Sequence, residues 1–196
     1  MLGIFLDIET TGLNPLRHHP IDIAIRVVDL STYQEIGAFQ TVIRQPKDFW
    51  DKRDPISIEI NGFTWEEVTK GKDPAIVGKE IIRMLTDLKI QRGSAVFICQ
   101  NPAFDRGFFN QLVDVYVQEL LNWPYHWLDL ASMFWTVRVL EAQQKGLPLP
   151  EKISLSKNDI AKEYNLPPEE CPHRAMRGVD HLFLCYKTVL ERRNFP

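Results

Sequence analysis

The chain has 196 residues, of which 44% are hydrophobic, 25% are charged and 11% are aromatic. A domain of this size hides roughly 70% of its unfolded surface on folding, so its stability requires neither a disulfide nor a metal ion. The net charge of −3 excludes a strongly basic nucleic-acid-binding coat and an acidic disordered tail. We therefore predict a single folded domain over residues 1–196.

The cysteine count and the length of the apolar runs indicate the compartment in which the protein works. Cys99, Cys171 and Cys185 are odd in number and lack the spacing of a zinc finger, so a disulfide framework is not predicted. No run of about 18 apolar residues is present, and no signal-peptide pattern precedes Leu2. The expectation is a soluble, unprocessed protein of the reducing cytoplasm.

The N-terminal half is predicted to form strands and then short helices. Residues 2–6 are apolar and run into a series of turn formers, which indicates a strand followed by a polar loop. Residues 21–30 and 35–44 alternate in polarity and are rich in β-branched side chains, a pattern typical of a hairpin. Capping signals and a helical period then predict helices over residues 56–61, 64–70 and 74–88.

The C-terminal half alternates between strands and helices. Residues 95–99 form a compact apolar run, which predicts a buried strand, and an amphipathic helix is expected over residues 103–121. We expect a short strand over residues 127–130 and helices over residues 130–142, 155–164 and 174–192. Strands first, and then strands alternating with helices, predict an α/β fold around a mixed sheet.

Asp7 and Glu9 lie at the end of the first predicted strand. Because side chains alternate between the two faces of a strand, both carboxylates point to the same side. Two such acids repel and raise each other's pKa unless a divalent cation lies beside them, and oxygen-only ligands favour Mg²⁺ or Mn²⁺. Taken alone, the pair is also compatible with a solvated strand end.

Two further segments carry groups of the same chemistry. Asp105 follows the predicted strand at 95–99, and the carboxyl ends of neighbouring parallel strands meet at one edge of a sheet. Taken alone, Asp105 is also compatible with an acid that interacts favourably with the first turn of a helix. His173, at a loop-to-helix junction, is a candidate general base because its ordinary pKa lies near ~6.5, and Asp180 is a candidate further metal ligand.

Taken together, four segments resemble the motifs of one nuclease family. They are FLDIETTGL at residues 5–13, NGFT at 61–64, NPAFD at 101–105 and HRAM at 173–176. In order and spacing they resemble the motifs of the DEDD superfamily of 3′–5′ exonucleases, in its histidine-containing (DEDDh) branch. The likeness spans nearly the whole chain and implies a ribonuclease-H-like fold, with a central mixed five-stranded sheet flanked by helices.

The resemblance also implies a reaction and a set of site residues. It implies hydrolysis of phosphodiester bonds at the 3′ end of DNA or RNA, with release of nucleoside monophosphates. Two Mg²⁺ or Mn²⁺ ions would be held by Asp7, Glu9 and Asp105, and His173 would activate the attacking water. Such a pair of cations stabilises both the attacking and the leaving oxygen of an in-line displacement.

By the same resemblance, a second group of residues would bind the terminal nucleotide. Its members are Thr10, Thr11, Gly12, Leu13, Phe63 and Asn101. The implied partners are 3′ ends of single-stranded DNA or RNA. The resemblance leaves open whether the protein forms a homodimer or is a polymerase subunit, and it leaves the choice between DNA and RNA open as well.

One position departs from the family pattern. The last aspartate of the family follows the histidine by five positions, and here that position is Gly178. Asp180 lies two residues further, which on a helix turns its side chain by roughly 200°. Either Asp180 or a water molecule replaces the missing ligand in an active enzyme, or the protein is a weakened nuclease or a nucleic-acid-binding module. In the second case, Gly178→Asp is expected to raise the rate.

Overall fold

The centre of the molecule is a mixed five-stranded sheet. The computed structural model describes residues 1–191. The strands are β1 (Leu2–Thr10), β2 (Pro20–Asp29), β3 (Glu35–Val42), β4 (Ala95–Cys99) and β5 (Trp127–Asp129). They lie in the order β3-β2-β1-β4-β5, with β1–β2 and β2–β3 antiparallel and β1–β4 and β4–β5 parallel. This topology confirms the predicted hairpin and the predicted mixed sheet.

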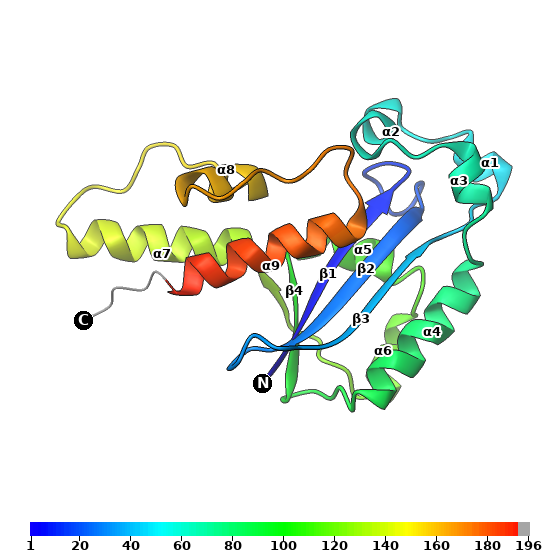
Figure 1. Cartoon of the computed structure of the whole chain (residues 1–196), viewed down its shortest axis with the longest axis horizontal. Helices are drawn as coiled ribbons and strands as arrows, with labels where there is room; N and C mark the ends of the chain where they lie inside the picture. Colours follow the sequence, from blue (N-terminus) through cyan, green and yellow to red (C-terminus); the bar gives the residue numbers. More distant parts are fainter. Residues whose placement is uncertain (192–196) are drawn as a thin grey trace.

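Nine helices among residues 1–191 surround the sheet (Figure 1). The N-terminal ones are α1 (Lys47–Trp50), α2 (Pro55–Asn61), α3 (Trp65–Thr69) and α4 (Pro74–Asp87). The C-terminal ones are α5 (Pro102–Phe109), α6 (Val115–Leu120), α7 (Leu130–Gln144), α8 (Lys157–Glu163) and α9 (Ala175–Glu191). No helix of this described part is both long enough and apolar enough to cross a membrane.

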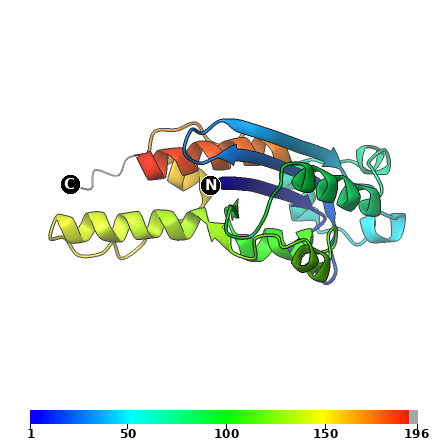
Figure 2. The ribbon, with the colours of Figure 1, turned by 90° about the horizontal axis from the view of Figure 1, so that it is seen from below.

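The alternation of side chains along β1 divides the core into two layers. Ile4, Leu6 and Ile8 pack with α4 and α5 on one face, whereas Phe5 packs with α7, α8 and α9 on the other. Figure 1 shows these last three helices grouped beside the sheet, and Figure 2 shows α7 extending past its end. Asp7 has the parity of Phe5, so its carboxylate faces the α9 side.

Several elements differ from their predicted bounds, and the largest differences concern three regions. The helix expected over residues 103–121 is two helices, because the Asp114 side chain accepts a hydrogen bond from the Tyr116 N–H and starts α6 as a separate helix. The strand expected to end at residue 6 continues to Thr10, since its pairing with β2 persists. The loop at residues 46–55 contains α1, and residue 192 of the last predicted helix lies outside the described residues.

The segment between α2 and α3 forms a tight turn near the end of β1. Gly62 adopts a φ of 64°, a left-handed conformation that favours glycine. Thr64 and Glu67 then form a capping box that starts α3. A buried cluster of Ile21, Trp50, Phe63 and Val68 packs beneath this turn. The turn therefore holds a fixed surface beside the carboxyl end of β1.

Candidate active site

The topology explains why the candidate acids meet. The pairing of β1 with β4 ends at Phe5 and Ile98, so the rest of β1 has an open edge on the β4 side. Three residues after β4, α5 begins at Pro102, and its first turn carries Asp105. This short connection brings Asp105 to the open edge of β1, as the parallel pairing of the two strands predicts.

The candidate residues line one cavity of about 360 Å³. Its lining includes the predicted site residues Asp7, Glu9, Asn101, Asp105 and His173, together with Lys157 and Glu169. Asp105 is only 6% exposed, and the side chain of Asp7 is 18% exposed. The structure thus brings together three carboxylates and one imidazole that are far apart in the sequence.

The three carboxylates share an electrostatic environment that disfavours their charged forms. Burial raises the pKa of Asp7, although the nearby ammonium of Lys157 lowers it. Burial, followed by the charges of Asp7 and Glu169, raises the pKa of Glu9 to about 8. Burial and the charge of Asp7 raise the pKa of Asp105 well above its ordinary value. A positive ion between these groups would reverse the effect.

His173 is held at the rim of the cavity from two directions. Its backbone N–H donates to the Ile60 carbonyl of α2 at 3.1 Å. Its Nδ1 lies 4.0 Å from Oε1 of Glu169, and its side chain is 27% exposed. The imidazole is therefore close to the carboxylates and accessible to water.

Asp180 is not brought to this site. Its carboxylate pairs with Nη2 of Arg26, a residue of β2, and its side chain is 53% exposed. The turn of roughly 200° between residues 178 and 180 accounts for this position, because α9 presents Gly178 to Asp7 and Asp180 to β2. The prediction of Asp180 as a metal ligand therefore has no geometric support.

The residues predicted to bind the nucleotide fall into two groups. Thr10 and Thr11 are buried, and their hydroxyls shape the loop through contacts with the Gly12 carbonyl and the His19 N–H. Leu13 is 71% exposed and could contact a ligand. Phe63, by contrast, is 3% exposed, and the Arg174 guanidinium lies 3.7 Å from the centre of its ring. Its side chain packs in the core and is not available to a base in this structure.

Two charged residues of the cavity were not predicted from the sequence. Lys157 begins α8, and Glu169 lies in the loop before α9 with its side chain only 3% exposed. Their N–O distance is 2.9 Å. An acid four residues before His173 is a weak sequence signal for Glu169, but Glu170 beside it offers the same signal. Nothing in the sequence singles out Lys157.

The donor set suits a hard divalent cation, but it is not arranged as a complete site. Carboxylate oxygens are the ligands that Mg²⁺ and Mn²⁺ prefer, and burial, the largest cause, raises the pKa of all three acids, an effect that a bound cation would oppose. Within residues 1–191, however, no three His, Cys, Asp or Glu side chains are grouped closely enough to hold a metal ion as they stand. Asp7 instead contacts the ammonium of Lys157.

A larger hollow of about 620 Å³ lies elsewhere, between the β1–β2 loop and α4. Its lining includes Pro15, His19 and Phe49, and its acid, Asp73, caps α4 and pairs with Arg44. The converging carboxylates that metal-dependent chemistry requires are therefore found in the smaller cavity.

Comparison with solved structures identifies the fold. The chain aligns with E. coli Exonuclease I bound to a dT13 oligonucleotide at a TM-score of 0.74 and 20% identity, covering 98% of this chain and 41% of that one. Cell-death related nuclease 4 (CRN-4) aligns at 0.72 and 15% identity, covering 98% and 64%. The nuclease domain of 3′hExo, described as a DEDDh family member bound to rAMP, aligns at 0.69 and 13% identity, covering 98% and 92%.

These likenesses are all below 25% identity and show the fold. The chain spans about two fifths of the length of Exonuclease I. No curated protein matches the sequence significantly. The model of the exonuclease family (RNase_T) matches residues 4–179, which include every motif named above. Members of this family act on phosphodiester bonds and generally use divalent metal ions. The chain therefore belongs to the RNase_T exonuclease family.

Proposed function

We propose that the protein removes nucleoside monophosphates from the 3′ ends of single-stranded DNA or RNA. The observation that carries the proposal is the single cavity lined by Asp7, Glu9, Asp105 and His173. Carboxylates that converge from separate segments at a sheet edge are what metal-assisted displacement at phosphorus requires. The cavity would admit the end of a strand to these groups.

Asp7, Glu9 and Asp105 would hold Mg²⁺ or Mn²⁺, and the family resemblance implies two ions. When bound, a divalent ion stabilises the negative charge that develops on the phosphate oxygens. The acid that the family takes from α9 is missing at Gly178. Asp180 has no part in this proposal, because its carboxylate pairs with Arg26.

His173 would take the proton of the attacking water. Its Nδ1 faces the buried carboxylate of Glu169 at 4.0 Å, so Nε2 is the nitrogen that would accept the proton. The negative charge of Glu169 would then stabilise the imidazolium that forms. This arrangement would orient the ring through the charge of Glu169 and leave Nε2 for the reaction.

The terminal nucleotide would bind along the loop that follows β1. Thr10, Thr11 and Gly12 would present backbone groups, Leu13 would contact a base, and Asn101 would contact the strand from the start of α5. The buried Phe63 would support this surface from beneath. The protein would act in the cytoplasm, either as a homodimer or as a subunit of a polymerase, the two alternatives that the resemblance leaves open.

A second candidate function is nucleic-acid binding without hydrolysis. The observation in its favour is the ammonium of Lys157, which lies 3.3 Å from Oδ1 of Asp7 where a cation would be needed. The absence of an acid at Gly178 points in the same direction. A binding module would retain the strand-binding loop and the fold.

One experiment distinguishes the two candidates. Single-stranded DNA and RNA, labelled at the 3′ or the 5′ end, are incubated with Mg²⁺, Mn²⁺ or EDTA and the wild-type protein, Asp7→Asn or Asp114→Asn. Asp114 caps α6 away from the cavity, and asparagine caps equally well, so this variant controls for loss of one charge. Metal-dependent release of mononucleotides from the 3′ end, lost only in Asp7→Asn, supports the exonuclease. Intact strands that are shifted in a gel support the binding module.

A further inference from the structure

The place of the missing acid is closed to any side chain. A Cβ atom added at Gly178 would lie 2.2 Å from Oδ2 of Asp7 and 2.5 Å from its Cγ. Real Cβ atoms do not approach other atoms this closely. The backbone of α9 therefore packs directly against Asp7, and an acid at residue 178 is excluded unless Asp7 moves.

A fixed ammonium lies against the same carboxylate. The Nζ atom of Lys157 lies 3.3 Å from Oδ1 of Asp7, 3.2 Å from the Gly178 carbonyl oxygen and 2.9 Å from Oε2 of Glu169. Three oxygens from β1, α9 and the loop before α9 thus surround it, and its side chain is 11% exposed. Two of these oxygens belong to carboxylates, so the ammonium forms ion pairs with both Asp7 and Glu169.

One carboxylate oxygen of Glu169 is free to bind a further group. Its side chain is 3% exposed, and its Oε2 contacts Lys157. Its Oε1 is buried and has no hydrogen-bond partner among residues 1–191. Oε1 lies 4.0 Å from Nδ1 of His173, on the lining of the cavity. A buried carboxylate oxygen without a hydrogen-bond partner costs free energy. This indicates that another group binds this oxygen in the working protein.

We propose that the ammonium of Lys157 supplies the positive charge at Asp7, in the place where the family resemblance implies a second divalent ion. Glu169 supplies the fourth carboxylate in place of the residue missing at Gly178. The centre therefore binds one divalent ion per chain. This inference rests on the metal site of the proposed function and refines its stoichiometry. The physical reason is that an ammonium this close to Asp7 repels a second dication from the same carboxylate.

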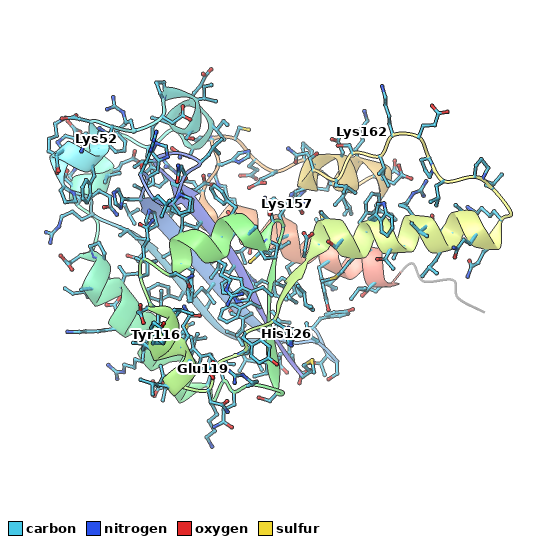
Figure 3. The ribbon with its side chains drawn as sticks, turned by 180° about the vertical axis from the view of Figure 1, so that it is seen from behind. Lys52, Tyr116, Glu119, His126, Lys157 and Lys162 are labelled. Atoms are coloured by element: carbon cyan, nitrogen blue, oxygen red, sulfur yellow. The ribbon has the colours of Figure 1, made fainter. Side chains whose placement is uncertain are left out.

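The test counts bound ions in the absence of nucleic acid. The full chain is titrated with Mn²⁺, and free Mn²⁺ is measured by electron paramagnetic resonance. The wild-type protein is expected to bind one Mn²⁺. Lys157→Met is expected to bind two, because the carboxylates of Asp7 and Glu169 are then both released. Lys162→Met is the matched control, since Lys162 is exposed on the outer side of the same helix, as Figure 3 shows, and it should bind one.

Each count decides the inference. Zero or two ions in the wild-type protein, or a single ion in folded Lys157→Met, overturns it. The wild-type count requires no variant, so a Lys157→Met protein that fails to fold leaves the test intact. The double variant Lys157→Met/Glu169→Gln removes both charges of the pair and should return to one ion, and two ions there would overturn the role of Glu169. One bound ion with intact strands in the nuclease assay contradicts the proposed function and leaves this inference standing.

Discussion

At the scale of single residues, the contact between Gly178 and Asp7 determines how the cavity is built. A methyl group at residue 178 would overlap the Asp7 carboxylate. Overpacking of this kind costs about 1–3 kcal/mol. Because Asp7 is short and is also held by Lys157, it has little freedom to avoid the overlap. We expect Gly178→Ala to lower the free energy of unfolding by about this amount and to reduce mononucleotide release, measured by urea titration and by the strand assay.

The same contact reverses an expectation drawn from the sequence. Gly178→Asp was expected to restore a metal ligand and raise the rate. With the Cβ position at 2.2 Å from Asp7, the variant instead places a second carboxylate against the first and displaces it. We therefore expect Gly178→Asp to be no faster than Gly178→Ala. A rate above that of the wild-type protein would show that α9 can move away from β1.

Asp180 provides the opposite case, an acid that should be dispensable for the reaction. Its exposed carboxylate pairs with Arg26, and exposed ion pairs contribute about 0–1 kcal/mol. We expect Asp180→Ala to keep its rate within about twofold of the wild-type value and to lower the free energy of unfolding by no more than that contribution. Asp105→Ala, measured in the same assay, should lose the activity. Loss of hydrolysis in Asp180→Ala would show that Asp180 takes part in the reaction.

Glu9 should make stability depend on pH when no divalent ion is present. Its pKa is about 8 in the folded protein and 4.5 for the ordinary side chain, so folding favours the protonated form. Below about pH 4.5, Glu9 makes its full contribution to the free energy of unfolding. This contribution is lost as the pH rises through about 8, and the free energy of unfolding falls by up to about 1.4 kcal/mol per pH unit. Urea unfolding in EDTA from pH 5 to 9 should show a smaller decline for Glu9→Gln. Equal slopes for the two proteins would contradict the buried, protonated state.

At the scale of elements, the start of α9 is held by residues from three other segments. The Ala175 N–H donates to Oδ2 of Asp22 on β2 at 3.0 Å. The His173 N–H donates to the Ile60 carbonyl of α2 at 3.1 Å. Arg174 donates to the Asn61 carbonyl and to Glu67. These contacts explain how a histidine late in the chain is fixed beside acids from its beginning.

Arg174 should therefore act on catalysis through the position of His173. Its guanidinium covers the Phe63 ring at 3.7 Å and pairs with Glu67 at 2.9 Å. Removing it loses a partly buried ion pair and a cation–π contact, each worth about 1 kcal/mol. We expect Arg174→Ala to lower both the melting temperature and kcat, as measured by thermal unfolding and initial rates. Arg177→Ala, at a more exposed neighbouring position, should change both much less.

At the scale of the whole molecule, the cavity exists only in the folded chain, because its acids come from β1, α5 and the loop before α9. A divalent ion that binds there stabilises the folded state by mass action, by about 2.7 kcal/mol at a hundredfold excess over Kd. For a domain of this size, this predicts a rise in Tm of roughly 5–10 °C with Mn²⁺. Asp7→Asn should show a much smaller rise. An equal rise in both proteins would place the ion outside this cavity.

The sequence alone determined the features that depend on local periodicity and short-range capping. Alternation along residues 21–30 and 35–44 predicted the hairpin, and the parity of Asp7 and Glu9 predicted a shared face. The ordered motifs predicted the exonuclease family, which the family model confirms over residues 4–179. These features depend on residues that are close in the sequence or on the order and spacing of the motifs along it. The split between α5 and α6 was missed because an amphipathic pattern continues across the Asp114 cap.

Only the tertiary structure decided how the charges of the cavity are balanced. Lys157 contacts Asp7 from 150 residues away along the chain, and Glu169 in turn contacts Lys157; no local pattern marks such long-range contacts. The rotation of α9 likewise directed Asp180 to Arg26 and the bare backbone of Gly178 to Asp7. The physical reason is that helix phase and loop path are set by packing against the sheet, whereas the sequence specifies only which faces are apolar.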